Sequence, residues 1–365
     1  RSFFMNAQAV QNVSVDTIPT YGPGTANPAE AQKVQVQAGV ETAMDIQLVA
    51  ARVATIRGRV VTSKGEAMVG GFVRLLASTT GLDTLGGRSG QMRGDGHFEI
   101  PSVPPGSYTL TVQPMMRGGP DQMPADTEGA NEPITVDGSD LDLLVRTTPG
   151  STASGRVVLE GADPAVLKTR ELRVQAMPVG PFVNVFFGPP GRGVITPELT
   201  FDVVGLRGLQ MLTVPLLPED WWVKDVRLDG QSVYEGHDFA SGRAFTGVEI
   251  VISGRPTGIQ GGVAASSGST AGDYAVVLFP AEEDRWERIG PGQMGPRAVR
   301  PGNDGTFRIA NVRPGEYYVL AMPVDQADMT ELSDPDRLRE LAARARTVTV
   351  EDGAMARVSL TLVSR

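Results

Sequence analysis

The sequence predicts an all-β protein built of tandem antiparallel β-sandwich domains. Three observations lead to this fold class: a duplicated segment, short strands of alternating hydrophobicity, and a high content of turn-forming residues. Glycine (44) and proline (27) make up about a fifth of the 365 residues, which favours a turn-rich β protein over a helical one. With 41% apolar residues, the chain can bury substantial cores.

The duplicated segment reads GDGHFEIPSVPPGSYTLTV at 94–112 and GNDGTFRIANVRPGEYYVL at 302–320. A single shift of 209 positions, without gaps, pairs eight identical residues, and such a match indicates a duplicated structural unit. The pairs are Asp95/Asp304, Gly96/Gly305, Phe98/Phe307, Ile100/Ile309, Val103/Val312, Pro105/Pro314, Gly106/Gly315 and Tyr108/Tyr317.

Each residue type in this segment has a mechanical role. Asp-Gly supplies a tight hairpin turn, Phe and Ile two positions apart point to one face of the next strand, and Pro-Gly turns the chain again before a Tyr whose ring faces inward. A degenerate copy, LTFDVVGLRGLQMLTV, keeps Phe201, Val203 and Leu206 but has Gly208 and Met211 where the other copies have Pro and Tyr.

Opening strands at 56–61, 153–158 and 259–264 set the domain boundaries at 53–149, 150–255 and 256–365. Each unit ends on a closing segment, such as PITVDGSDLDLLV or TVTVEDGAMARVSLTLV, whose alternation predicts half-buried antiparallel strands. Residues 1–52 carry only a closing hairpin, so we expect them to be the C-terminal part of a preceding sandwich. The start at Arg1 suggests a processed or excised piece of a longer protein.

One helix is predicted, as an insert over about 333–345 in the last unit. Ser333 is the N-cap candidate, the first turn is acidic, and Leu338 and Leu341 share one side. We expect this helix to pack on the edge of the sandwich.

These motifs resemble the carboxypeptidase regulatory-like domain, a seven-stranded immunoglobulin-like sandwich related to transthyretin and to starch-binding-like modules. The resemblance is carried by GRVV, VRLLA and DGHFEIPSVPPGSYTLTV, and by DYAVVLFPAEEDRW with RPGNDGTFRIANVRPGEYYVLAM. It covers nearly the whole chain and implies tandem copies in a large exported bacterial protein. In carboxypeptidases the module carries no catalytic residue, so the resemblance implies no enzyme activity.

Charge and composition argue against several functional classes. The formal net charge is −9 without a basic stripe, which disfavours nucleic-acid binding because phosphate contacts need clustered positive charge. The absence of cysteine excludes disulfides and zinc-thiolate sites. No apolar run approaches the ~18 residues of a membrane span. We expect an extracellular, cell-surface or periplasmic protein.

No catalytic, cofactor or metal site is predicted. The two histidines, His97 and His237, lie 140 positions apart in different units, and no third group suggests a triad. The acidic stretches DGSDLD and DPD lack the order of a calcium loop.

Three aromatic residues are candidate contacts for a ligand or partner: Trp222, Phe187 and Trp286. An exposed ring could stack on a sugar or anchor a protein, whereas a buried ring would pack in a core or between domains. Packing is the favoured interpretation, and the surface role is left open.

The sequence therefore predicts a non-enzymatic structural or assembly protein, such as a stalk, spacer or filament subunit. Unpaired strand edges in residues 1–52 would recruit other protein subunits, with further copies of the chain as one option, by strand addition. Two alternatives remain: a carbohydrate-binding or adhesive module for cell-surface glycans, and an accessory region of a larger exported enzyme or receptor.

Overall fold

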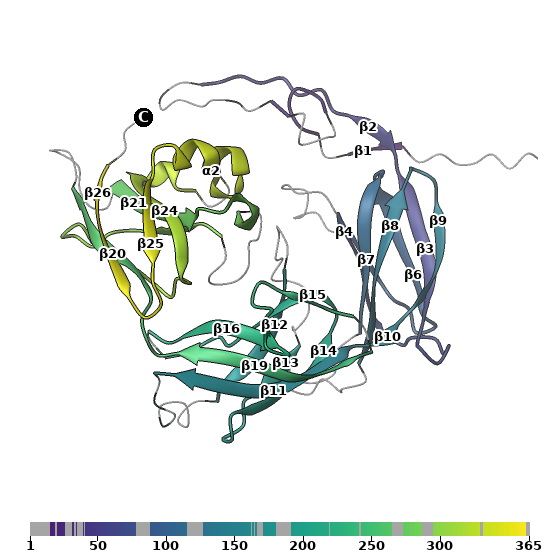
Figure 1. Cartoon of the computed structure of the whole chain (residues 1–365). Coiled ribbons are helices and arrows are strands. Elements are labelled where there is room, and N and C mark those ends of the chain that lie inside the picture. Colours follow the sequence, from purple (N-terminus) through teal and green to yellow (C-terminus); the bar gives the residue numbers. More distant parts are fainter. Residues whose placement is uncertain are drawn as a thin grey trace, which may run out of the picture. The chain divides into compact units, whose positions relative to one another are not determined.

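The protein folds almost entirely into β-strands (Figure 1), as a computed structural model describes it. The described residues are 15–18, 20–25, 31–32, 34, 39, 41–77, 88–114, 127–161, 163, 165, 171–179, 191–218, 220–240, 242–264, 273–286, 295–328 and 331–362. They fall into two compact units that meet in sequence between Pro149 and Gly150.

The first unit contains one sandwich, here called the first sandwich. Its three-stranded sheet has the order β6 (His97–Val103), β3 (Ala54–Val61), β9 (Leu141–Arg146). Its five-stranded sheet has the order β10 (Thr148–Pro149), β8 (Glu128–Val136), β7 (Gly106–Pro114), β4 (Gly71–Ala77), β5 (Arg88–Gln91). Both sheets contribute to one buried core, with Ile56 and Phe98 from one side and Leu75 and Leu110 from the other. A two-stranded sheet of β1 (Val15–Thr17) and β2 (Ala50–Arg52) precedes it.

The second unit begins with the middle sandwich. One sheet has the order β14 (Thr200–Leu206), β11 (Ser151–Glu160), β19 (Ala244–Ser253), β16 (Trp222–Leu228), β17 (Gln231–Ser232). The other has the order β13 (Arg192–Val194), β12 (Arg173–Pro178), β15 (Gly208–Thr213), β18 (His237–Phe239). Phe201 and Ile250 meet Ala176 and Phe239 in the shared core.

The C-terminal sandwich completes the second unit. Its three-stranded sheet is β23 (Thr306–Ala310), β20 (Gly258–Ala264), β26 (Met355–Thr361). Its four-stranded sheet is β22 (Arg297–Val299), β21 (Tyr274–Pro280), β24 (Gly315–Pro323), β25 (Arg346–Val350). Short 3₁₀ turns lie at Glu283–Arg285, Val324–Gln326 and Glu331–Ser333.

The pairing of opening and closing strands differs from the expected antiparallel arrangement. In every sandwich the opening strand pairs parallel with the last strand: β3 with β9, β11 with β19 and β20 with β26. The two arms of each predicted closing segment also lie in different sheets, since β8 and β25 join the sheets opposite β9 and β26. The chain therefore crosses from one sheet to the other just before the last strand. Because of this crossover the last strand runs parallel to the opening strand, whereas two strands joined by a hairpin would be antiparallel.

A glycine in each opening strand explains how closely the closing strand approaches. Gly58, Gly155 and Gly261 face Phe98, Phe201 and Phe307 in the same register. A Cβ atom on these glycines would lie 2.3, 1.7 and 1.7 Å from a carbonyl oxygen of the parallel closing strand. No side chain fits at these three positions.

The duplicated segment keeps its backbone conformation where its sequence changes. The turn residue is Gly96 (φ 84°) in the first sandwich, Leu199 (φ 62°) in the middle one and Gly305 (φ 77°) in the last. Their carbonyl oxygens accept equivalent bonds from Val60, Val157 and Val263. Six residues further on, Ser102, Gly205 and Asn311 share a positive φ. The turns join strands of opposite sheets, so they are corners rather than the predicted hairpins.

The predicted helix is present as α2 (Pro335–Ala342), shorter than expected. Its N-cap is Asp334, whose carboxylate accepts from the Asp336 amide, and not Ser333. Leu338 and Leu341 are buried as predicted. They pack on the outer face of the four-stranded sheet (Figure 1), in a second core that contains Phe279, Leu320, Met322 and Trp286. This explains why every residue of β21 is buried.

Candidate functional site

The two described aromatic candidates face the interior, so neither ring offers an exposed surface to a ligand or partner. Trp222 is 1% exposed and donates its indole N–H to the carbonyl oxygen of Arg255 at 3.1 Å. Trp286 is also 1% exposed and donates to Pro280 at 2.7 Å, with an edge contact to Phe279. Each ring has an apolar body to bury and one polar atom that finds a partner. Phe187 lies outside the described residues.

Trp222 belongs to a joint between the middle and C-terminal sandwiches, centred on residues 253–258. The Arg255 carbonyl oxygen also accepts from the hydroxyl of Thr257 at 3.3 Å, and that hydroxyl accepts from the Gly353 amide at 3.0 Å. Thr257 is completely buried. The linker is thus hydrogen-bonded to strand β16 on one side and to the β25–β26 turn on the other.

Ion pairs link the sandwiches that this linker joins. Lys224 Nζ lies 2.6 Å from a carboxylate oxygen of Glu160 in its own sandwich and 2.6 Å from one of Asp352 in the next. Partial burial acts to lower the pKa of Lys224, but the bonds to these two carboxylates outweigh it and raise that pKa. Arg308 of the C-terminal sandwich pairs with Asp220 of the middle one at 2.5 Å.

An aromatic contact adds to the joint. The guanidinium carbon of Arg313 lies 4.1 Å from the ring centroid of Tyr234, within the range of a cation–π interaction. Glu235 lies 3.3 Å from Arg285 and 4.0 Å from Arg313. Burial raises the pKa of Tyr234 to about 12, so the phenol stays neutral. All these residues come from the two sandwiches on opposite sides of the linker.

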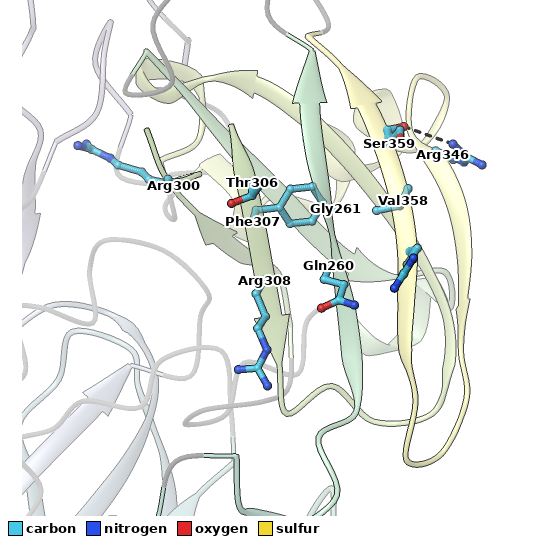
Figure 2. Close-up of a pocket in the computed structure, with 11 residues that line it drawn as sticks. Gln260, Gly261, Arg300, Thr306, Phe307, Arg308, Arg346, Val358 and Ser359 are labelled. Atoms are coloured by element: carbon cyan, nitrogen blue, oxygen red, sulfur yellow. Dashed lines mark hydrogen bonds between the residues drawn. The ribbon is translucent and has the colours of Figure 1, made fainter. Parts of the chain in front are cut away.

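A shallow hollow of about 800 Å³ lies over the outer face of the β23–β20–β26 sheet (Figure 2). Four arginines line it, together with glycines and small polar residues, and we call it the arginine hollow. Its lining is Gln260, Gly261, Arg300, Gly302, Thr306, Phe307, Arg308, Arg346, Arg357, Val358 and Ser359. Chemically, it offers N–H donors and positive charge to an anion.

The four arginines differ in how far they are already engaged. Arg308 binds Asp220, and Arg346 donates to the carbonyl oxygen of Ser359 at 3.3 Å, the dashed line in Figure 2. Arg300 and Arg357 form no ion pair or hydrogen bond with any residue that the structure describes. Both side chains are exposed. Two guanidinium groups are therefore available to a ligand.

Residues 41–49 differ from the closing strand predicted for them. Within the described part of the chain they pair with no strand, and the strand proper is limited to β2 at 50–52. Met44, Ile46 and Leu48 are 39, 49 and 69% exposed; at alternate positions of one segment they form what we call the apolar row. The Gln47 amide donates to Pro23 at 2.9 Å, which ties the segment to the preceding turn.

The two histidines have separate surroundings. His97 lies 3.1 Å from Asp95 beside the surface turn of the duplicated segment, whereas His237 packs edge-on against Phe239 and Phe245. Within the described ranges no group of three or more His, Cys, Asp or Glu residues could hold a metal ion. No described helix is long and apolar enough to cross a membrane.

Sequence reasoning missed the arginine hollow. Its residues are spread over 260–359 and come together only because β23, β20 and β26 are neighbours. One signal was present: a shift of 209 positions aligns Arg308 with Glu99, an exchange of charge within an otherwise matching segment.

No family model matches the chain, and no curated protein matches it. Among solved structures, the Bacillus anthracis TIE protein is 8% identical, with 87% of this chain and 54% of that chain covered and a TM-score of 0.20. A streptococcal ancillary pilin is 13% identical over 86% of this chain and 99% of that chain, with a TM-score of 0.22. The minor pilin GBS52 of Streptococcus agalactiae is 12% identical over 55% and 95%, with a TM-score of 0.27. This chain spans about half of the first of these proteins, and TM-scores this low carry no functional inference.

Proposed function

We propose that the protein is a non-enzymatic structural protein of the cell exterior or periplasm, in which successive sandwiches act as a spacer. The observation that carries this proposal is the joint. A buried threonine, a buried tryptophan and pairs between opposite charges hold the 253–258 linker and the two sandwiches beside it. Such contacts restrict the motion that a short linker would otherwise permit.

The spacer assembles with other protein subunits through residues 1–52. Support comes from the apolar row, because Met44, Ile46 and Leu48 expose alternate apolar side chains along a segment that pairs with no described strand. A strand from another subunit can pair with such a segment and cover the row. The same mechanical role applies if the chain is an accessory region of a larger exported enzyme or receptor.

The carbohydrate-binding alternative lacks a specific observation in its favour. Its argument rested on rings that could stack on a sugar, and Trp222 and Trp286 are buried with their N–H groups bonded to backbone carbonyls.

Light scattering coupled to size-exclusion chromatography tests the assembly role on the whole chain. We expect the wild type to show masses above 38.6 kDa that rise with concentration, and Ile46→Lys to shift the population to monomer. Val69→Lys is the matched control, because Val69 is 73% exposed but lies outside the apolar row. A monomeric wild type, or an equal effect of both substitutions, would refute assembly through this segment.

A further inference from the structure

The outer face of the first sandwich neutralises its own charge. On the β6–β3–β9 sheet, Arg57 of the central strand lies opposite Glu99 and Asp142 in the strand register. Its guanidinium pairs with Glu99 and with Asp140, each at 3.1 Å. The central cation is thus flanked by carboxylates of the same sandwich, and its charge is balanced without an external ion.

The C-terminal sandwich reverses this pattern. The register that places Glu99 and Asp142 beside Arg57 places Arg308 and Arg357 beside Gln260. Carboxylates on both flanking strands are replaced by arginines, and the central arginine is replaced by a neutral amide. In the middle sandwich the position equivalent to Arg308 is Asp202, so the arginine is particular to the last copy.

The face has room above it because small residues stand where the first sandwich has long ones. Gly262 occupies the register position of Arg59, and a Cβ atom there would meet nothing closer than the Gly305 carbonyl oxygen at 3.9 Å. Arg308 and Arg357 flank Gln260, the neighbouring outward position of the same strand, and lie two strand spacings or about 10 Å apart at the backbone. Gln260 adds an amide donor between them.

One carboxylate of the protein itself lies at the margin of the arginine hollow. Asp220 reaches from the middle sandwich to Arg308 at 2.5 Å. Asp304 forms no ion pair with a described arginine, and its carboxylate accepts from the amide and hydroxyl of Thr306 at 3.0 and 2.7 Å. The face therefore binds a carboxylate with one arginine and leaves Arg300 and Arg357 without a described partner.

We propose that the arginine hollow is a binding site for the carboxylates of an extended acidic segment of a partner protein. An extended chain presents alternate side chains about 7 Å apart, and arginine side chains are long enough to reach ligand groups at that spacing from backbones about 10 Å apart. A sugar ligand is disfavoured because the only aromatic residue of the lining, Phe307, is 6% exposed and offers no stacking surface. The proposal is independent of assembly through residues 41–49.

Fluorescence anisotropy with a labelled hexaglutamate peptide tests the site on the whole chain. We expect saturable binding at low ionic strength that weakens as salt is added, because exposed charges are screened. Arg357→Glu should weaken binding about tenfold or more, since a like charge then faces the ligand. Arg59→Glu is the matched control: it makes the same charge change on the equivalent face of the first sandwich and should leave the affinity unchanged.

Three results would overturn the proposal. The first is no binding of the peptide at low salt. The second is an equal loss in Arg357→Glu and Arg59→Glu, which would indicate a general effect of net charge. The third is tighter binding of polygalacturonate than of hexaglutamate at equal charge concentration, which would assign the hollow to an acidic glycan. Arg357→Gln, which keeps a polar side chain without the charge, should give an intermediate affinity if the fold is intact.

Discussion

Trp222 donates its indole proton to the carbonyl oxygen of Arg255, 33 residues later in the chain, at 3.1 Å. The bond links strand β16 of the middle sandwich to the linker that leads into the C-terminal sandwich. A buried tryptophan therefore holds a connection between two sandwiches, rather than only filling a core.

Replacing Trp222 by Phe should loosen this linker. The substitution leaves a buried carbonyl with one partner fewer and removes part of a large ring, at a cost of about 1–3 kcal/mol. Hydrogen exchange of the peptide covering 253–258 should accelerate, including the Gly254 and Gly258 amides, which donate to Glu160 and Ala354. Trp286→Phe is the control, because its indole bonds within the C-terminal sandwich. Equal exchange in both variants would contradict a role of Trp222 in the joint.

Two adjacent glycines of β20 should respond oppositely to alanine. A Cβ on Gly261 would lie 1.7 Å from the Val358 carbonyl oxygen, so Gly261→Ala must separate the parallel pair and should cost about 3 kcal/mol or more. Gly262 has open space and no positive φ, so Gly262→Ala should be neutral or stabilising by up to about 1 kcal/mol. Thermal unfolding compares the two variants directly. Similar unfolding midpoints would contradict a clash between a Cβ atom at position 261 and strand β26.

The tyrosines of the duplicated segment should stabilise their own sandwiches by similar amounts. Tyr108 donates to the Pro104 carbonyl oxygen and Tyr317 to that of Arg313, each at 2.9 Å and four residues upstream. Tyr108→Phe and Tyr317→Phe should each cost about 1 kcal/mol, and their effects should add because the residues lie in separate cores. Hydrogen-exchange free energies of β7 and β24 amides measure each loss in its own domain. A Tyr108→Phe effect that spread to β24 would contradict this independence.

The carboxylate of Glu128 should make the first sandwich sensitive to acid. Its partial burial acts to raise its pKa, but hydrogen bonds from Ser63 and Thr147 outweigh that effect and lower the pKa below the 4.5 of a free glutamate. A lowered pKa in the folded state gives stability that is fully present above about pH 4.5 and lost as the pH falls through the folded value.

Calorimetry of the wild type and Glu128→Gln measures this contribution. We expect the difference in unfolding temperature of the first sandwich to be largest near neutral pH and to shrink as the pH falls below about 4.5. Glu132→Gln, at an exposed position of the same strand β8, serves as the control. A difference between wild type and Glu128→Gln that stayed constant with pH would contradict the assignment.

Much of the fold was predictable because its signals are local. The shift of 209 positions identified the duplicated unit, and alternation located the strands around Phe98 and Phe307. Parallel pairing of the first and last strands was missed, since alternation gives the buried face of a strand but not its neighbour or direction. The positive φ of Leu199 could not be predicted either. Leucine rarely adopts a positive φ, whereas the other two copies have glycine at this position.

The sites were less predictable than the fold. Trp222 and Trp286 were recognised as informative residues, but their burial depends on where β16 and α2 pack. The arginine hollow joins side chains from three strands, and its charge pattern emerges only when the register of Gln260 is compared with that of Arg57. Such comparisons need the sheet order, which residue spacing alone does not supply.

The parallel pairing of opening and closing strands also sets the order in which the chain can fold. In the first sandwich Arg57 pairs with Asp142, 85 positions later, and such non-local contacts slow folding because a long loop must close first. During synthesis an opening strand cannot pair with its closing strand until nearly its whole domain has left the ribosome. Its similarity to the next opening strand then creates a risk of pairing with the wrong closing strand. A corner that forms early, such as the Asp95–Gly96 turn, would hold each nascent domain together until its own last strand arrives.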